Sequence, residues 1–216
     1  MSPKLSDNQK EQRNLQILEA AKRAFEQKGY GATTLKDIVE EAGMSRGWIY
    51  LYYKSKEEIF EALLHWQDMR YKEHIEALIH SSLSIWKIIQ HLYEQQLEDL
   101  LRFPNAGLQS AFYEYALIGS RDEARRDLLT KRYDSGIAQF ATLIRIGVDR
   151  GEFSPDIDAK DISRIVASFQ EGIMTHSITV GTEKAKTRMQ FEALITYLKT
   201  ILHPVMIHEP DHSEEK

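Results

Sequence analysis

Residues 33–56, TTLKDIVEEAGMSRGWIYLYYKSK, carry two short helix patterns separated by a glycine, and no other stretch constrains the fold as strongly. Thr34 is placed to cap the first helix, and Asp37 follows three residues later, as in a capping box. Apolar residues then repeat at helical spacing as far as Ala42. The pattern predicts a short helix with one apolar face and a defined start.

A second helix is predicted directly after the first. Gly43 stands where the chain must leave a helix with positive φ, a conformation that glycine adopts without steric cost. Ser45 is placed to cap a helix that runs from Arg46 to about Tyr52. The segment therefore predicts a helix, a tight turn and a second helix.

The second helix is expected to present aromatic and basic side chains to a partner. Ile49 and Tyr53 lie four residues apart and are expected to face inward. The residues left on the outside or the flanks are Arg46, Gly47, Trp48, Tyr50, Leu51 and Tyr52. An isolated protein rarely exposes so much aromatic surface without a partner.

The charge pattern indicates what that partner is. No acidic residue lies between Glu41 and Glu57, whereas Arg46, Lys54 and Lys56 do, in a chain of formal net charge −5. Basic groups, hydroxyls and helix N-terminal amides on one convex surface suit the phosphates on either side of a DNA major groove. The first 60 residues hold ten Lys and Arg against nine Asp and Glu, whereas the remaining residues hold 18 against 24. The positive charge is therefore local to the first part of the chain.

Residues from about 10 to 60 carry a family resemblance at many fixed spacings. They are Arg13, Ile17, Leu18, Ala20, Ala21, Phe25, Gly29, Tyr30, Thr33, Thr34, Ile38, Ala42, Gly43, Ser45, Gly47, Ile49, Tyr50, Tyr52, Tyr53, Lys56 and Glu57. This region resembles the N-terminal signature of TetR-type transcriptional regulators. The resemblance implies a three-helix DNA-binding head. After about residue 60, the chain resembles the family only in its length and helical character.

Eleven residues are predicted to contact DNA. We expect Thr34, Tyr50, Tyr52 and Lys56 to hold phosphates, while Arg46 is the candidate for a two-pronged contact to guanine. The full set is Thr33, Thr34, Lys36, Ser45, Arg46, Gly47, Trp48, Tyr50, Leu51, Tyr52 and Lys56.

Composition places the chain among ordinary globular proteins. Hydrophobic residues make up 42% and charged residues 28% of 216 residues. The chain has no cysteine, which excludes disulfides and thiolate chemistry and fits a reducing compartment. No apolar run is long enough to span a bilayer, and the first ten residues are too polar for a signal peptide. We therefore expect a cytoplasmic protein.

The fold class is predicted to be all-α, with about nine helices, because every apolar pattern repeats at three to four residues. The expected DNA-binding domain is 1–54, and 55–216 is an effector-binding and dimerisation domain with a mobile tail. Predicted helices run over about 10–28, 34–42, 46–52, 55–79, 84–102, up to 118, 122–150, 159–180 and 183–202. Pro104 is expected to end the fifth of them.

The last two long helices resemble the pair by which TetR-type proteins form a twofold interface. A dimer would present two heads to two inverted half-sites about 34 Å apart. The candidate interface residues are Ile162, Ile165, Val166, Leu194, Leu198 and Ile201.

A cavity for a small apolar effector is implied by the resemblance alone. Flat aromatic rings and methionine suit loosely specified hydrophobic ligands. The candidate lining is Trp66, Trp86, Phe103, Phe112, Tyr113, Phe140, Phe169, Met174 and His176, with Gln109, Glu114 and Gln139 as further polar groups. The same aromatic residues are also explained by simple core packing.

The resulting hypothesis is a homodimeric, ligand-responsive repressor that binds a palindromic operator in double-stranded DNA. Two alternatives remain open: a DNA-binding regulator without an effector, and an all-helical enzyme or carrier in which residues 33–56 only pack. The sequence shows no HExxH, phosphate-binding loop or nucleophile elbow, so we expect no metal, no cofactor and no enzymatic activity. We expect no membrane partner either.

Overall fold

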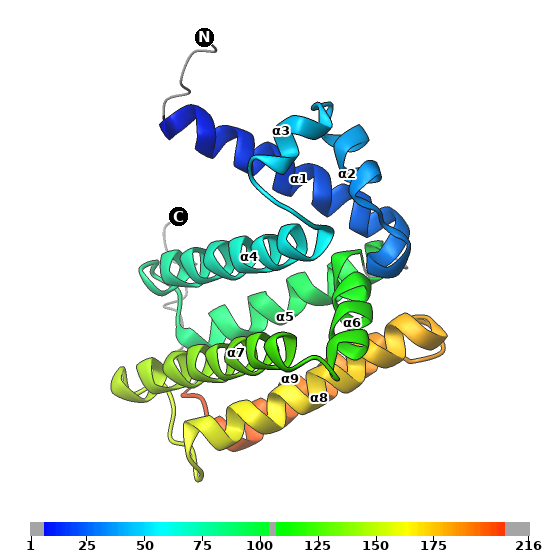
Figure 1. The fold of residues 1–216 in the computed structure, drawn as a ribbon. Helices are drawn as coiled ribbons and strands as arrows, with labels where there is room; N and C mark the ends of the chain where they lie inside the picture. Colours follow the sequence, from blue (N-terminus) through cyan, green and yellow to red (C-terminus); the bar gives the residue numbers. More distant parts are fainter. Residues whose placement is uncertain (1–6, 104–106, 206–216) are drawn as a thin grey trace, which may run out of the picture. The chain divides into compact units, whose positions relative to one another are not determined.

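The computed structural model describes residues 7–103 and 107–205, and these form nine α-helices with no strand among them (Figure 1). The all-α prediction is confirmed. The helices are α1 (Asp7–Ala32), α2 (Leu35–Ala42), α3 (Arg46–Tyr50), α4 (Lys56–Ile79), α5 (Ile85–Arg102), α6 (Leu108–Gly119), α7 (Glu123–Asp149), α8 (Ala159–Val180) and α9 (Thr187–Leu202). The predictions for Pro104 and for the tail at 208–216 lie outside the described residues.

The chain divides into two compact units. The first unit takes its described residues from 1–80 and 102–129, and the second from 81–101 and 130–216. The first unit therefore contains α1 to α4, α6 and the start of α7, and the second contains most of α5 and α7 with α8 and α9. The functional boundary expected near residue 55 remains a prediction.

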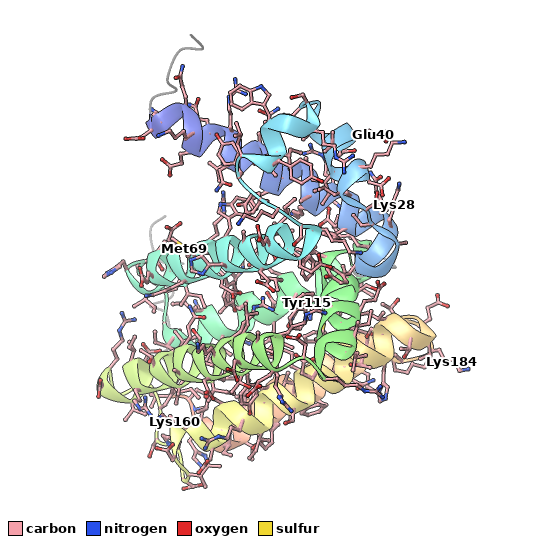
Figure 2. All side chains as sticks on the ribbon, viewed as in Figure 1. Lys28, Glu40, Met69, Tyr115, Lys160 and Lys184 are labelled. Carbon is pink, nitrogen blue, oxygen red and sulfur yellow. The ribbon has the colours of Figure 1, made fainter. Side chains whose placement is uncertain are left out.

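Aromatic rings form the centre of the first unit. The Phe60 ring of α4 lies 4.7 Å from Phe25 of α1 and 4.9 Å from both Tyr30 and Tyr115, centroid to centroid. All four rings are buried, and Figure 2 marks Tyr115 on α6. Interlocking aromatic pairs of this kind stabilise a core beyond the area they bury. Helices α4 and α6 are thus packed against α1 within this unit.

The two tyrosines of this cluster keep their hydroxyls paired. Tyr30 donates to Glu57 at 3.0 Å, and Tyr115 donates to Glu61 at 2.7 Å. Burial, and then the hydrogen bond to a carboxylate, raises the pKa of both tyrosine hydroxyls well above the usual range. For Glu57, burial alone would raise the pKa, but hydrogen bonds from its own backbone, Tyr30 and Ser55 together lower it.

Gly29 interrupts α1, as its place in the sequence predicted. Its φ of 75° and ψ of 171° are non-helical, so the last residues of the helix turn away from the main axis. A conformation in this region is essentially restricted to glycine. The kink carries Tyr30 into the aromatic cluster.

The second unit has its own apolar interior. Tyr93 of α5 packs against Phe140 of α7 and Phe191 of α9, with centroid separations of 6.4 and 6.2 Å. Helices α8 and α9 run side by side (Figure 1). The carboxylate of buried Glu152 accepts a hydrogen bond of 2.6 Å from the N–H of Ile85, so it caps the start of α5.

Several predicted helix ends were wrong, including those of α1, which runs from Asp7 to Ala32 rather than over about 10–28. Helix α9 begins at Thr187 rather than at about residue 183, because residues 182–186 form a turn that Lys186 closes with a φ of 53°. Helix α3 ends at Tyr50, two residues earlier than expected. Among the helices of 7–103 and 107–205, none combines the length and hydropathy of a bilayer-spanning segment.

Candidate DNA-binding surface

Helix α2 begins with the predicted capping box. The Thr34 hydroxyl accepts from Asp37 N–H at 3.2 Å, and the Asp37 carboxylate accepts from Thr34 N–H at 2.8 Å. The Lys28 ammonium donates to the same carboxylate at 2.7 Å. These bonds, first from Lys28 and then from Thr34, hold the pKa of Asp37 well below its usual range. Lys28 and Glu40 lie at the exposed side of this region (Figure 2).

The turn between α2 and α3 also follows the prediction. Gly43 is left-handed, with φ 62° and ψ 24°, and its N–H donates to the Glu40 carbonyl at 3.2 Å. Ser45 has the extended backbone of an N-cap, but its hydroxyl makes no capping bond. The expected side-chain cap was therefore wrong, and the exposed Ser45 hydroxyl faces solvent instead.

Helix α3 is held to α1 from its inner side. Ile49 is fully buried, and the Tyr53 hydroxyl donates to the Asn14 side-chain oxygen at 2.6 Å. The Gln16 amide donates to the Ala42 carbonyl at 3.1 Å, which ties α1 to the turn. The inward placement of Ile49 and Tyr53 is as predicted, so the opposite side of α3 is the outward one.

The outward side of α3 carries the residues predicted to approach DNA. Ser45, Arg46, Gly47, Tyr50 and Leu51 are exposed, and Trp48 and Tyr52 are half-buried. Leu51 is 73% exposed, which is high for a leucine without a partner. The Arg46 guanidinium donates to the Tyr50 hydroxyl at 2.9 Å, which leaves its other N–H groups available to a ligand.

Thr33 and Lys56 were predicted to contact DNA, and the structure gives both of them partners within the chain. Thr33 is fully buried, and its hydroxyl donates to the carbonyl oxygens of Gly29 and Ala24 at 2.6 and 3.2 Å. The Lys56 ammonium donates to the carbonyl oxygens of Tyr30, Gly31 and Thr33 at 2.9, 3.2 and 2.9 Å. Since an ammonium has three N–H donors, these bonds use its full capacity.

Lys36 and Lys54 are two further basic residues with exposed side chains in this region. Lys36, from the predicted set, is exposed and lies 3.6 Å from the Glu40 carboxylate. Lys54 is exposed at the end of the same acid-free window, although we had not assigned it a DNA contact. Its charge and position in the sequence were sufficient signals for that assignment.

The predicted effector residues are divided between the two units. In the first, Trp66 lies beneath the Arg70 guanidinium at 5.2 Å, Phe112 and Tyr113 pack at 5.9 Å, and Phe103 is 52% exposed. In the second, Met174 is buried, Trp86, Phe140 and Phe169 are half-buried, and His176 is exposed. Glu114, expected as a polar group of the cavity, instead accepts a hydrogen bond from Gly31 N–H.

Four of the six predicted interface residues belong to the interior of the second unit. Ile162, Val166, Leu194 and Leu198 are buried within one chain, where α8 and α9 pack. That part of the prediction was wrong, because helical periodicity does not distinguish the two apolar faces of a helix. Ile165 is 45% exposed and Ile201 is half-buried, so Ile165 stays accessible to a second copy.

Two family descriptions match the chain in separate regions. Residues 17–63, which include α2 and α3, match "Bacterial regulatory proteins, tetR family". Residues 87–188 match "Tetracyclin repressor-like, C-terminal domain".

Relatives and solved structures agree with these matches. The uncharacterized HTH-type transcriptional regulator YfiR of Bacillus subtilis is 37% identical over 204 residues, which cover 94% of this chain and 98% of the relative. The HTH-type transcriptional regulator QacR of Staphylococcus aureus is 28% identical over 74% of this chain and 82% of its own length. The reduced form of Escherichia coli NemR superposes with a TM-score of 0.74 at 16% identity, covering 91% of this chain and all of NemR.

These matches exclude the alternative of a helical enzyme or carrier. The described fold is all-helical, its capped helix pair has an outward face, and YfiR matches the chain nearly end to end. Each of these observations indicates a helix-turn-helix transcriptional regulator. The chain therefore belongs to the TetR family of bacterial transcriptional regulators, with a helix-turn-helix DNA-binding module whose family match spans residues 17–63.

Proposed function

We propose that this regulator is a homodimeric repressor that binds an inverted-repeat operator and leaves it when a small hydrophobic effector binds. The observation that carries the proposal is the outward side of α3, where Arg46, Tyr50 and Leu51 are exposed in a window without acidic residues. Ile49 holds the opposite side of the helix in the core. This arrangement suits insertion of α3 into a major groove.

Arg46 is the proposed base-reading residue. Its guanidinium is oriented by the Tyr50 hydroxyl and keeps donors for the O6 and N7 atoms of a guanine. Lys54, Lys36 and the Tyr52 hydroxyl are the proposed phosphate contacts, since all three side chains reach solvent in this region. Loss of one two-pronged base contact costs about 1–3 kcal/mol of discrimination against the wrong base pair.

Dimerisation is proposed through the outer side of α8 and α9. Ile165 of α8 and Met189 of α9 are 45% and 60% exposed, and both belong to the second unit. Burying such apolar groups against the same groups of a second copy gives the twofold symmetry that an inverted repeat requires. We expect Ile165→Glu to yield a monomer in sedimentation velocity, whereas Ile165→Leu remains a dimer.

The proposed effector site lies among the aromatic side chains of the second unit. Tyr93, Phe140 and Phe191 form its ring cluster, and Gln170 of α8 donates to Gln96 of α5 at 2.9 Å as a polar pair. Apolar walls with a few placed amides are typical of small-molecule sites. A structural neighbour described as a transcriptional regulator from Saccharomonospora viridis was solved in complex with choline, and SmeT is the repressor of a Stenotrophomonas maltophilia multidrug efflux pump.

Selection from a random duplex pool tests the DNA-binding proposal. We expect an inverted repeat to emerge, and Arg46→Ala to lose preference at one base pair of each half-site. Lys72→Ala, an exposed lysine of α4, is the matched control and should leave the preference unchanged. If selection with the wild-type chain enriched no common sequence in the duplex pool, the proposal would be refuted.

A thermal-shift screen tests the effector. Compounds that raise the melting temperature are then added to the operator complex, and release of DNA is expected. Release from mostly bound to mostly free requires that the effector prefer the released state by about 5 kcal/mol. Stabilising compounds that leave operator affinity unchanged would favour the alternative of a regulator without an effector.

A further inference from the structure

A concavity of about 670 Å³ lies beside α3, between the first half of α1 and the turn that precedes α3. The residues that line it come from both sides: Gln9, Gln12, Arg13, Gln16, Gly43, Met44, Ser45 and Trp48. Among the described residues that line it, Arg13 is the only charged one. The concavity therefore combines one cation with amide groups next to the proposed DNA-reading helix.

Arg13 is stacked on Trp48. The central carbon of its guanidinium lies 4.1 Å from the centroid of the indole ring, within the range of a cation–π contact. Within the described residues Arg13 has no carboxylate partner, whereas Arg23 of the same helix pairs with Glu41 at 2.6 Å. A stacked guanidinium keeps its N–H groups at the edges of its plane, where they match the geometry of a phosphate.

Two hydrogen bonds fix α1 against the module at this place. The Gln16 amide binds the Ala42 carbonyl at 3.1 Å, and Asn14 accepts from Tyr53 at 2.6 Å. Both residues lie within three positions of Arg13. The part of α1 that carries Arg13 is thus fixed relative to α3 and the turn.

We propose that Arg13 extends the DNA-binding surface from α3 onto α1, where it orients Trp48 and donates its N–H groups to a DNA phosphate. The inference rests on the proposed function, in which α3 enters a major groove. A cation without a carboxylate partner among the described residues attracts a phosphate, and the stack of Arg13 on Trp48 fixes the indole ring beside the base-reading residues. Arg13 is a phosphate-binding residue, and toward Trp48 it is a positioning residue.

The test measures binding of the full-length chain to its selected operator by fluorescence anisotropy over a series of salt concentrations. We expect Arg13→Ala to weaken binding at least tenfold and to reduce the slope of log K against log salt by about 0.9 per subunit. Arg13→Lys restores the slope, because it keeps the charge, but not the full affinity, because an ammonium lacks the planar stack. Arg23→Ala, which removes an arginine from the same helix, should change neither slope nor affinity by more than twofold.

A double-mutant cycle tests the role of the stack. With Trp48→Ala as background, Arg13→Lys should have a smaller effect on affinity than it has in the wild-type chain. Equal effects in both backgrounds would overturn the positioning role. Arg13→Gln is the second variant, since it keeps a polar side chain of similar reach if Arg13→Ala unfolds.

The two levels of the proposal fail in different ways. A wild-type chain that selects no duplex overturns the proposed function. A wild-type chain that binds its operator, with an Arg13→Ala variant of unchanged salt slope and affinity, overturns only the inference about Arg13.

Discussion

The carboxylate of Glu114 on α6 accepts a hydrogen bond of 2.7 Å from the backbone N–H of Gly31, next to the kink of α1. The same carboxylate lies too close to the position that a Cβ atom on Gly29 would take for both to stay in place. Helix α6 therefore holds the end of α1 through the main chain, and a side chain at position 29 would have to displace the Glu114 carboxylate. Since α1 supports α2 and α3, the contact links α6 to the DNA-binding module inside the first unit.

Removal of the Glu114 carboxylate should destabilise the first unit. We expect Glu114→Ala to lower the free energy of unfolding by about 1–2 kcal/mol, because the Gly31 N–H loses a charged acceptor. Glu114→Gln should recover part of the loss, and Glu73→Ala, at an exposed site on α4, should have almost no effect. Urea denaturation measures all three, and equal stabilities of the Glu114→Ala and Glu73→Ala variants would contradict the assignment.

A side chain at Gly29 should be costly for two separate reasons. Gly29→Ala must adopt a φ of 75° and must also displace the Glu114 carboxylate, so we expect a loss of about 1–3 kcal/mol. Gly136→Ala is the matched control, since Gly136 lies in α7 with no atom near its missing Cβ. Calorimetry should find that this control is neutral or stabilised by up to about 1 kcal/mol. A Gly29→Ala variant as stable as the control would show that the kink is dispensable.

Lys56 and Lys54 should behave differently although they lie two residues apart. Lys56 binds three carbonyl oxygens at the end of α1, and its ammonium also lies 4.6 Å above the Tyr30 ring, so Lys56→Ala should lower the melting temperature by several degrees. Lys54 is exposed, so Lys54→Ala should keep the melting temperature and reduce the salt slope of DNA binding by about 0.9 per subunit. If Lys56→Ala reduced the salt slope and Lys54→Ala lowered the melting temperature, Lys56 rather than Lys54 would be the phosphate contact.

The capping box of α2 should make stability depend on pH. The pKa of Asp37 is lowered in the folded protein by Lys28 and Thr34. The ionised carboxylate therefore stabilises the fold fully at pH values above the unfolded pKa of about 3.9, and this stabilisation is lost as the pH falls below that value. We expect wild type to melt above Asp37→Asn at pH 7 and the gap to narrow below about pH 4. Asp134→Asn, at an exposed site on α7, is the control and should show no such gap. A gap that stays constant down to pH 3 would mean that Asp37 acts without its charge.

The elements that the sequence alone determined are those whose causes lie within a few residues. The box of Thr34 and Asp37, the left-handed Gly43 and the break at Gly29 were all predictable, because each depends on a local backbone conformation or cap. Helical periodicity likewise predicted the all-α class and most helix bounds. The outward face of α3 followed from the inward spacing of Ile49 and Tyr53.

Only the tertiary structure decided which of two equivalent faces or partners a residue takes. The apolar stripe of α8 predicted Ile162 and Ile165 as one surface, yet packing against α9 buries the first and leaves the second exposed. Lys56 was expected at a phosphate, but the kink at Gly29 brings carbonyl oxygens to it from 23 to 26 residues away. Arg13 and Trp48 are 35 positions apart in the sequence, and their stack exists only because α1 packs against the helix pair. Such contacts depend on how helices pack, and no local pattern of residues encodes that packing.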